Sequence, residues 1–265
     1  MKYVLVSGAS GGMGRQTVSY LLKQGYYVFA LDNKEIEKQE NVYPILVDVT
    51  DEKSINEAYK IVSKITNFLD AIIHFAGIYM LDSLVEISKE KLEKIFEINF
   101  FGVYSVNKIF LPLLKNNSRI IITTSELAPL NPLPFTGIYA ISKSTLDKYA
   151  YSLNMELQLL NIKVSVLRAG AIKTNMLNVS TLQLDEFVNK TKLYKCNAKR
   201  FKKIVDSVET KSVLPIKVAQ KVYKILNKKN PSFTYKINNN FYLKLLSVLP
   251  KRWQFFIIKQ VLKEK

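Results

Sequence analysis

Short apolar strands alternate with amphipathic helices along the first 174 residues of this chain. "KYVLVSG", "YYVFALD" and "FLDAIIHFAG" are apolar runs of strand length, rich in β-branched and aromatic residues. Helical patterns lie at residues 13–24, 51–66 and 138–160. Strands that are apolar on both faces need helices on both sides of their sheet. The pattern therefore predicts a doubly wound parallel α/β fold.

The remaining elements continue the same alternation. "VYPILVDVT", "SRIIITTS" and "IKVSVLRAG" predict the third, fifth and sixth strands. A long helix is expected from about Ser88 to Lys115, with Pro112 kinking it near its end. "PIKVAQKVYKILNKK" predicts a helix, and "PSFTYKI" predicts a last strand. Because no repeat or linker interrupts the chain, we expect residues 1–265 to form one domain.

A glycine-rich turn joins the first strand to the first helix. "VLVSGASGGMGRQ" places Gly8, Gly12 and Gly14 there, spaced as G-x-x-x-G-x-G. Glycines at this junction permit a tight turn and let a pyrophosphate approach the backbone N–H groups of the helix N-terminus. A glycine turn alone punctuates any strand–helix junction, so the motif gains weight only from its position in an α/β chain.

Two aspartates end neighbouring strands of the predicted sheet. Asp32 ends the second strand, where a carboxylate can bond the adenosine ribose hydroxyls and would repel a 2′-phosphate. This favours NAD over NADP, although Lys34 could weaken the preference. Asp48 ends the third strand, on the edge where ligands bind in open α/β sheets. Either residue, taken alone, could also be an ordinary turn residue.

The motif "GIYAISK" sets Tyr139 and Lys143 four residues apart on a predicted helix. This spacing puts both side chains on one face, about 5–6 Å apart at Cβ. Tyrosine has an ordinary pKa of about 10, and a neighbouring ammonium lowers it. The pair could therefore transfer protons at neutral pH, or it could be two unrelated helix residues.

Composition excludes several other classes of protein. The apolar content of 48% and the mixed charges are typical of a globular chain rather than a disordered one. The single cysteine, Cys196, excludes an internal disulfide framework, and with one histidine no metal site is expected. No signal peptide or membrane span is predicted, so we expect a cytoplasmic protein.

In their order along the chain, these motifs resemble the short-chain dehydrogenase/reductase family of Rossmann-type oxidoreductases. "SGASGGMG" is similar to the family's T-G-x-x-x-G-x-G, "DVT" to its adenine-contacting segment and "HFAG" to its N-N-A-G. "EINFFGVY" is similar to its helix-four asparagine motif, "YAISK" to Y-x-x-x-K and "RAGAIKT" to P-G-x-x-x-T. The resemblance implies an enzyme that interconverts an alcohol and a ketone or aldehyde, with NAD as cofactor and NADP less favoured.

The resemblance also implies a role for each matching residue. Tyr139 would exchange a proton with the carbonyl oxygen, and Lys143 would lower the pKa of Tyr139 and bind the nicotinamide ribose. Ser125 would orient the carbonyl, and Asn99 would hold a water that links Lys143 to solvent. The implied cofactor-binding residues are Gly8, Ser10, Gly12, Met13, Gly14, Asp32, Asp48, Val49, Ala76, Gly77, Tyr139, Lys143, Ile172 and Thr174, the last near the nicotinamide carboxamide.

Three departures from the family pattern matter. Ser125 and Tyr139 are 14 residues apart, one more than is usual, so a one-residue bulge is expected between them and Thr124 is an alternative to Ser125. His74 and Phe75 replace the paired asparagines of N-N-A-G, and we expect His74 to be structural. Ala169 replaces the proline of P-G.

Charge is concentrated in the C-terminal third. Residues 1–175 hold 19 basic and 17 acidic residues, whereas residues 176–265 hold 20 and 5, a net charge of +15. Such asymmetry indicates an acidic partner or surface, or only a lysine-rich background composition. By resemblance, residues 1–174 would form the cofactor-binding and catalytic core, 175–214 a helical substrate lid, and 215–265 the last helix–strand unit and tail.

The sequence of the C-terminal tail predicts a basic amphipathic helix, for which two interpretations are open. Its apolar residues could contact an anionic membrane reversibly, at the inner membrane surface, or pack on the domain or on a second subunit. Packing is the commoner fate of apolar residues at helical spacing. Tails of this kind resemble those of family members acting on sterols, retinoids or acyl chains. These apolar residues are Phe241, Leu245, Leu246, Trp253, Phe256, Ile257 and Leu262.

The expected partners are a small alcohol or carbonyl substrate and a second copy of the chain. The helix from Ser88 and the helix carrying Tyr139 resemble the pair that joins subunits in the family, so a homodimer or homotetramer is expected. Nucleic acid is not expected, because the basic residues adjoin aliphatics rather than exposed aromatic platforms. The rival function is a non-catalytic NAD(H)-binding sensor of the same fold.

Overall fold

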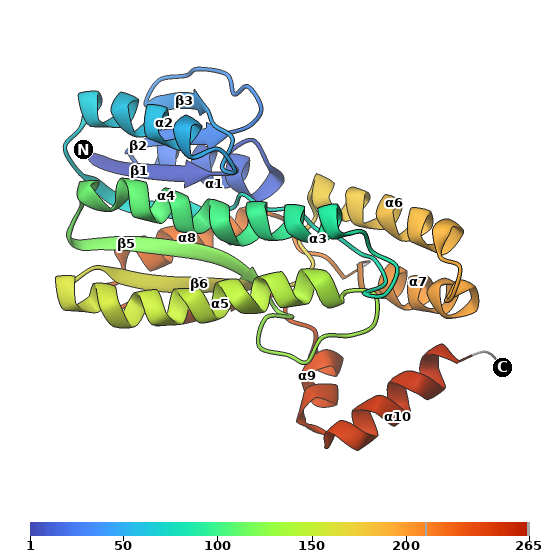
Figure 1. Ribbon diagram of the computed structural model, residues 1–265. Helices are drawn as coiled ribbons and strands as arrows, with labels where there is room; N and C mark the ends of the chain where they lie inside the picture. The colour runs from blue at the N-terminus through green and yellow to red at the C-terminus, as the bar shows by residue number, and fades with distance from the viewer. Residues whose placement is uncertain (210, 264–265) are drawn as a thin grey trace.

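The computed structural model describes residues 1–209 and 211–263, and its centre is a seven-stranded parallel sheet (Figure 1). The strands lie in the order β3-β2-β1-β4-β5-β6-β7. The predicted doubly wound α/β fold is confirmed. The strand bounds are β1 Lys2–Ser7, β2 Tyr26–Asp32, β3 Val42–Leu46, β4 Leu69–His74, β5 Leu114–Ser125, β6 Lys163–Ala169 and β7 Thr234–Ile237.

Helices cover both faces of the sheet and form two separate apolar cores. On one face, α1 (Gly12–Lys23) and α8 (Ile216–Asn227) bury Val18, Leu21 and Val222 against the strands. On the other face lie α2 (Glu52–Ile65), α4 (Gly102–Phe110) and α5 (Gly137–Leu157). Figure 1 shows α4 and α5 running across this second face. Because both faces are covered, the central parts of the strands are apolar on both sides.

The chain changes winding direction beside β1. This strand pairs with β2 on one side and with β4 on the other, and Ser7 at its end is in register with His74. In open α/β sheets, the loops diverge at such a switch point and ligands bind outside the carboxyl ends of the strands. The glycine-rich turn and the "HFAG" motif therefore meet at the switch point of the sheet.

The predicted helix from Ser88 to Lys115 is wrong at its C-terminal end. Helix α3 (Lys89–Phe96) continues through a π-helical turn, η1 (Glu97–Phe101), into α4, and the helix then ends. A 3₁₀ turn at Leu111–Leu113 follows, and β5 begins at Leu114, four residues before the predicted start. Pro112 lies within the 3₁₀ turn, where its missing N–H ends the helix rather than kinking it.

A third apolar cluster lies beyond the carboxyl ends of the strands. It joins α6 (Asn175–Lys190) and α7 (Lys195–Glu209) to the loop before α5 and to the end of the last helix. The segment 175–214, for which the sequence predicts helical structure, thus contains α6 and α7. The buried members of the cluster are Leu81, Phe135, Leu184, Phe187, Ala198, Phe201 and Leu262.

The C-terminal segment forms two helices, which corrects the prediction of one. Helix α9 (Phe241–Val248) and helix α10 (Lys251–Leu262) are separated at Leu249 and Pro250. Leu249 is extended, with φ −71° and ψ 151°, because a residue before proline avoids the helical region. Figure 1 shows the pair projecting from the layered body of the molecule. None of the described helices combines the length and apolarity needed to cross a bilayer.

Candidate active site

Three chemically matched side chains meet where β5 ends and α5 begins. Ser125 is the last residue of β5, and Tyr139 and Lys143 lie in the first two turns of α5. The side chains of Ser125 and Tyr139 form a hydrogen bond. The Lys143 ammonium lies 5.9 Å from the centre of the Tyr139 ring and 3.4 Å from the carbonyl oxygen of Thr123. The helix periodicity therefore places tyrosine and lysine on one face, as their spacing predicts.

Burial dominates the electrostatics of this cluster. It raises the pKa of Tyr139 to about 12, with the hydrogen bond from Ser125 opposing the rise and the charge of Glu126 adding to it. Burial also lowers the pKa of Lys143 to about 8. Lys143 is not among the groups that shift the pKa of Tyr139 here, so the expectation that it lowers this pKa stays a prediction. Part of the Tyr139 side chain remains accessible, as a group that meets a substrate requires.

Asn99 supports the cluster from the π-helical turn. Its side-chain oxygen accepts from the backbone N–H of Ile78 at 2.8 Å, and its amide donates to the carbonyl of Ile78 at 3.0 Å and to Ser142 Oγ at 3.1 Å. A Cβ on Gly77 would lie 3.0 Å from this amide oxygen and 3.3 Å from Lys143 Nζ. Gly77, Asn99 and Lys143 are thus packed together. Both amide N–H groups of Asn99 are thus used within the protein, and its side-chain oxygen accepts one hydrogen bond.

The glycine-rich turn is shaped for close approach. Gly8 has φ +71°, and a Cβ there would lie 2.4 Å from the backbone nitrogen of Ala76. A Cβ on Gly12 would lie 2.6 Å from Thr174 Cγ2, which brings the turn and the "RAGAIKT" motif together. Gly14 is packed so tightly on the carbonyl of Gly8 that no side chain fits. Each glycine is required by its contacts.

The N-terminus of α1 is free of competing groups. Its N-cap residue is Gly11, which has no side chain to cap the helix, and its first turn holds no acidic residue. Unsatisfied N–H groups and the positive end of the helix dipole bind phosphate groups. Together with the tight glycine packing, this feature fits the pyrophosphate of a dinucleotide.

The two aspartates that are predicted to contact the adenosine lie at the end of β2 and just after β3. One carboxylate oxygen of Asp32 accepts from the N–H of Ser10 at 2.9 Å, and the other accepts from the N–H of Lys34 at 3.1 Å. The carboxylate of Asp48 instead accepts from the N–H of Thr50 at 2.9 Å and from its hydroxyl at 2.7 Å. Asp32 is therefore tied to the glycine-rich turn, whereas Asp48 closes its own turn.

Three other predicted cofactor-binding residues are apolar and make packing contacts. Val49 lies against Gly102, where a Cβ would come within 2.8 Å of its side chain. Met13 packs against the core beneath α1. Ile172 is buried and forms a β-bridge with Val213. These three residues contribute apolar walls rather than polar contacts.

Thr124, the alternative to Ser125, lies in a different network. Its hydroxyl donates to Asp147 at 3.2 Å, and Asp147 is paired with Arg168 at 3.0 and 2.7 Å. Ser125 is therefore the hydroxyl residue that reaches Tyr139. In the loop expected to hold the extra residue, Phe135 adopts φ 65° and packs into the third apolar cluster.

His74 is structural. It is buried, with Nε2 2.8 Å from Asn107 Oδ1 and Nδ1 3.3 Å from Ser7 Oγ. Burial lowers its pKa to about 4, so the ring is neutral at physiological pH. A neutral ring with its proton on Nε2 donates to Asn107 and accepts from Ser7. His74 thus ties β4 to β1 and α4.

Two residues of the site escape sequence reasoning. The ring of Tyr79 lies 4.7 Å from that of Tyr139, centre to centre. Glu126 follows Ser125, and burial raises the pKa of its carboxyl group, which accepts from the backbone N–H of Asn240. An acidic residue directly after the serine is the only sequence signal for Glu126. Tyr79 has none, because its contact depends on the path of a loop.

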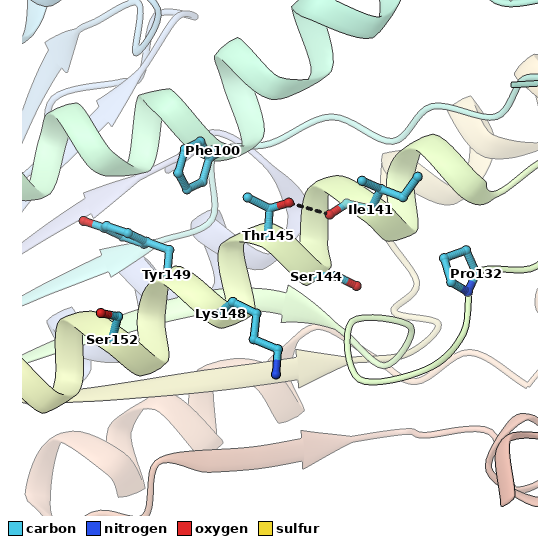
Figure 2. Close-up of a pocket in the computed structure, with 8 residues that line it drawn as sticks. All are labelled: Phe100, Pro132, Ile141, Ser144, Thr145, Lys148, Tyr149 and Ser152. Carbon is cyan, nitrogen blue, oxygen red and sulfur yellow. Dashed lines mark hydrogen bonds between the residues drawn. The ribbon is translucent and has the colours of Figure 1, made fainter.

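The pocket in Figure 2 lies outside this cluster. It has a volume of about 700 Å³ and lies between α5 and the π-helical turn. None of Ser125, Tyr139 and Lys143 lines it, so it is not the reaction site. Among the described residues, no three His, Cys, Asp or Glu side chains gather in a way that could hold a metal ion. The lining residues are Phe100, Pro132, Ile141, Ser144, Thr145, Lys148, Tyr149 and Ser152.

Comparison with known proteins agrees with this geometry. The family model described as "short chain dehydrogenase" matches residues 2–185. A 3-ketodihydrosphingosine reductase of Bacteroides thetaiotaomicron is 28% identical over 235 residues, which cover 88% of this chain and 87% of that protein. An NADPH-dependent 1-acyldihydroxyacetone phosphate reductase of Schizosaccharomyces pombe is 29% identical over 182 residues, 66% of this chain and 61% of that protein.

Solved structures share the fold at lower identity. The ligand-free aldohexose dehydrogenase of Thermoplasma acidophilum superposes with a TM-score of 0.76 at 17% identity, over 94% of this chain and 96% of that one. A 3-ketoacyl-(acyl-carrier-protein) reductase of Brucella melitensis complexed with NADH superposes with a TM-score of 0.73 at 17% identity, over 89% and 96%. The family match agrees with the glycine-rich turn and with the Ser125–Tyr139–Lys143 cluster. The chain therefore belongs to the short-chain dehydrogenase/reductase family of oxidoreductases, which act on CH–OH groups with NAD(P).

Proposed function

We propose that this enzyme interconverts an alcohol and a ketone or aldehyde with NAD(H), on an apolar substrate of lipid, sterol or acyl type. The observation that carries the proposal is the buried cluster of Ser125, Tyr139 and Lys143 beside the glycine-rich turn. The substrate class is supported by the printed names of two relatives, which act on a sphingoid base and on an acyl lipid. The aromatic ring of Tyr79 against Tyr139 adds an apolar wall.

The roles of the three side chains follow from their chemistry. When bound, the nicotinamide cofactor supplies or accepts the hydride. In reduction, Tyr139 donates its phenolic proton to the carbonyl oxygen, and in oxidation it takes the hydroxyl proton of the alcohol. Ser125, bonded to Tyr139, holds the same oxygen. Lys143, whose pKa is about 8, exchanges protons near neutral pH. It would return to Tyr139 the proton lost in reduction, through a water that Asn99 would hold.

The three parts of the chain would divide this work. Residues 1–174 would hold the cofactor and carry the reacting groups. Residues 175–214 act as a lid over the substrate, because α6 and α7 pack beyond the carboxyl ends of the strands. Gln183 on α6 donates to the carbonyl of Tyr79 at 3.2 Å, which attaches the lid to the wall of the site. Residues 215–265 complete the sheet and add the tail.

For the cofactor, we expect NAD to bind more tightly than NADP. The Asp32 carboxylate lies at the end of β2, where it would face a 2′-phosphate, and like charges in contact are costly. Arg15, which donates to the carbonyl of Ser10 at 3.2 Å, is the nearby cation that opposes this preference. Titration of both cofactors should show that Asp32→Ala reduces the preference for NAD by about tenfold or more. Tighter binding of NADP by the wild type would overturn the assignment.

A helix pair on the outer face supports a homodimer or homotetramer. The π-helical turn, α4 and α5 expose Phe101, Tyr104, Ile141 and Tyr151. The pocket of Figure 2 lies beside them, between the π-helical turn and α5. Two copies of this face would bury these side chains against each other. Light scattering at micromolar concentration tests the assembly. A monomer alone at that concentration would contradict it.

Turnover separates the enzyme from the rival NAD(H) sensor. A panel of primary and secondary alcohols of increasing chain length is offered with NAD, and NADH formation is recorded. We expect turnover that increases with apolar chain length and disappears in Lys143→Ala. Cofactor binding without turnover on any alcohol or ketone would favour the sensor. Turnover restricted to short polar alcohols would leave the oxidoreductase intact and overturn the apolar substrate.

A further inference from the structure

Helix α9 presents an apolar face to solvent. Phe241, Leu245 and Val248 lie on one side of the helix, since i, i+4 and i+7 positions share a face. Their exposed fractions are 69%, 51% and 70%. The half-buried residues Leu243 and Leu246 lie on the other side. A helix that only completes a domain would turn its apolar face inward, so this orientation needs another explanation.

Helix α10 repeats the arrangement. It is held to the body by buried Gln254 and Leu262, and Gln254 bonds to Asn131 at 3.1 Å. Trp253 and Phe256 lie on the opposite face, 58% and 53% exposed, with ring centres 6.2 Å apart. The packing that the sequence allowed is therefore present, but it uses one face of α10 and leaves the aromatic residues outside.

Basic residues accompany these apolar faces. Residues 241–263 contain five lysines and arginines and no acidic residue. On α10, Arg252 and Lys259 are exposed and fall on one side of the helix, beside Phe256, and the exposed Lys263 follows the end of the helix. Exposed aromatic and aliphatic side chains flanked by cations are the pattern of a helix that lies in the headgroup region of a bilayer.

We propose that the exposed apolar faces of α9 and α10, defined by Phe241, Leu245, Val248, Trp253 and Phe256, dock on a membrane that carries anionic lipid. A second copy of the chain is the less suitable occupant. A two-fold contact between identical faces would bring the same basic residues together, whereas anionic headgroups neutralise them. The proposed association is reversible, because helices that lie in the headgroup region bind through limited apolar area and electrostatic attraction.

The docking surface is connected to the active site. Asn240 caps α9 by accepting from the N–H of Tyr242 at 2.9 Å, and its own N–H donates to the Glu126 carboxylate. Glu126 directly follows Ser125 in sequence. Docking of α9 and α10 would therefore hold the catalytic serine loop close to the bilayer, where an apolar substrate resides.

The fluorescence of Trp253 provides a direct test, because it is the only tryptophan in the chain. The full-length protein is mixed with vesicles of phosphatidylcholine alone or of phosphatidylcholine with phosphatidylglycerol, at about 0.1 M and about 1 M salt. We expect a blue shift of the Trp253 emission and co-sedimentation only with the anionic vesicles at low salt. High salt should reverse both, since it screens the headgroup attraction.

Two pairs of variants assign the effect to these faces. The double variant Leu245→Gln with Phe256→Gln keeps the Trp253 probe and should weaken partitioning into vesicles about tenfold or more. Its control is Leu159→Gln with Leu160→Gln, which changes two exposed apolar residues just beyond the C-terminal end of α5. The double variant Arg252→Gln with Lys259→Gln should weaken partitioning about tenfold. Its control is Lys228→Gln with Lys229→Gln, which changes two exposed basic residues elsewhere. All eight positions are exposed, and a thermal melt of each variant checks that it folds.

The proposal goes beyond the proposed function, because vesicle binding is measured without substrate or cofactor. It is overturned if anionic vesicles leave the Trp253 emission unchanged, if neutral vesicles bind equally well, or if the control variants lose as much binding as the test variants. It is also overturned if the blue shift appears without lipid when the protein concentration is raised and the molecular mass in solution rises with it. That result would assign the surface to a second copy.

Discussion

The start of α5 and the α9–α10 pair differ in which side chains they bury and which they expose. At the start of α5, ionisable groups are buried and shift their pKa values, Tyr139 to about 12 and Lys143 to about 8. In the α9–α10 pair, large apolar groups such as Phe241 and Trp253 are exposed. Each arrangement has a cost in stability, because buried charges and exposed apolar surface are both unfavourable. The comparison teaches that the unfavourable positions of a fold indicate where it acts on other molecules.

The largest expected effect comes from the phenol of Tyr139. In Tyr139→Phe, kcat/KM for alcohol oxidation should fall by a factor of about 10² to 10⁴, because a positioned acid/base group contributes this much. NAD affinity, measured by titration, should change little. Tyr151→Phe removes an exposed hydroxyl from the same helix and serves as the control. Full activity in Tyr139→Phe would show that the buried cluster is not the reacting group.

Acid should weaken the fold through His74. Its pKa is about 4 in the folded protein and about 6.5 when unfolded, so between these values the unfolded chain binds the extra proton. The stabilisation from the neutral ring is complete above pH 6.5 and falls by about 3 kcal/mol as the pH drops to about 4. Urea unfolding of wild type and His74→Asn at pH 7.5, 5.5 and about 4 measures the difference.

The asparagine variant should show a shallower loss of stability with acid than the wild type, because it lacks the titrating ring. The introduced amide would keep polar contact with Ser7 and Asn107, so His74→Asn is expected to fold. Unfolding free energies that run parallel over this pH range in the two proteins would mean that other groups carry the acid sensitivity.

The smallest effect should come from the charge of Glu126. This carboxylate raises the pKa of Tyr139, so Glu126→Gln should lower that pKa and shift the pH profile of alcohol oxidation toward lower pH. Glutamine keeps an oxygen that can accept from the N–H of Asn240, so the attachment of α9 is retained. Glu156→Gln, an exposed change on the same helix as Tyr139, should leave the profile in place. An unchanged pH profile in Glu126→Gln would show that the charge of Glu126, which holds α9, does not affect Tyr139.

Sequence reasoning succeeded where structure is local. The strand β2 was predicted with its observed bounds, Tyr26–Asp32, because an apolar run between two turn signals determines both ends. The spacing of Tyr139 and Lys143 placed them on one face because helix periodicity is fixed. Both predictions depend on residues close together in the chain.

It failed where a proline has more than one outcome. Pro112 ends α4 where a kink was expected, and Pro250 divides the tail into two helices. A proline removes one N–H wherever it stands, but the surrounding packing decides whether the helix bends or stops. Before Pro112 the chain must turn to enter β5, and this requirement comes from the sheet rather than from the local sequence.

By itself, the sequence determined the alternation of strands and helices, the glycine turn at the mouth of α1 and the tyrosine–lysine pair, because each depends on spacings within a few residues. Only the tertiary structure decided that Tyr79 lies on Tyr139, that Thr124 is taken up by Asp147, and that Glu126 holds the cap of α9. It also decided which apolar residues of the tail remain exposed. The reason is that these contacts join residues far apart in the chain, and their formation depends on how whole elements pack.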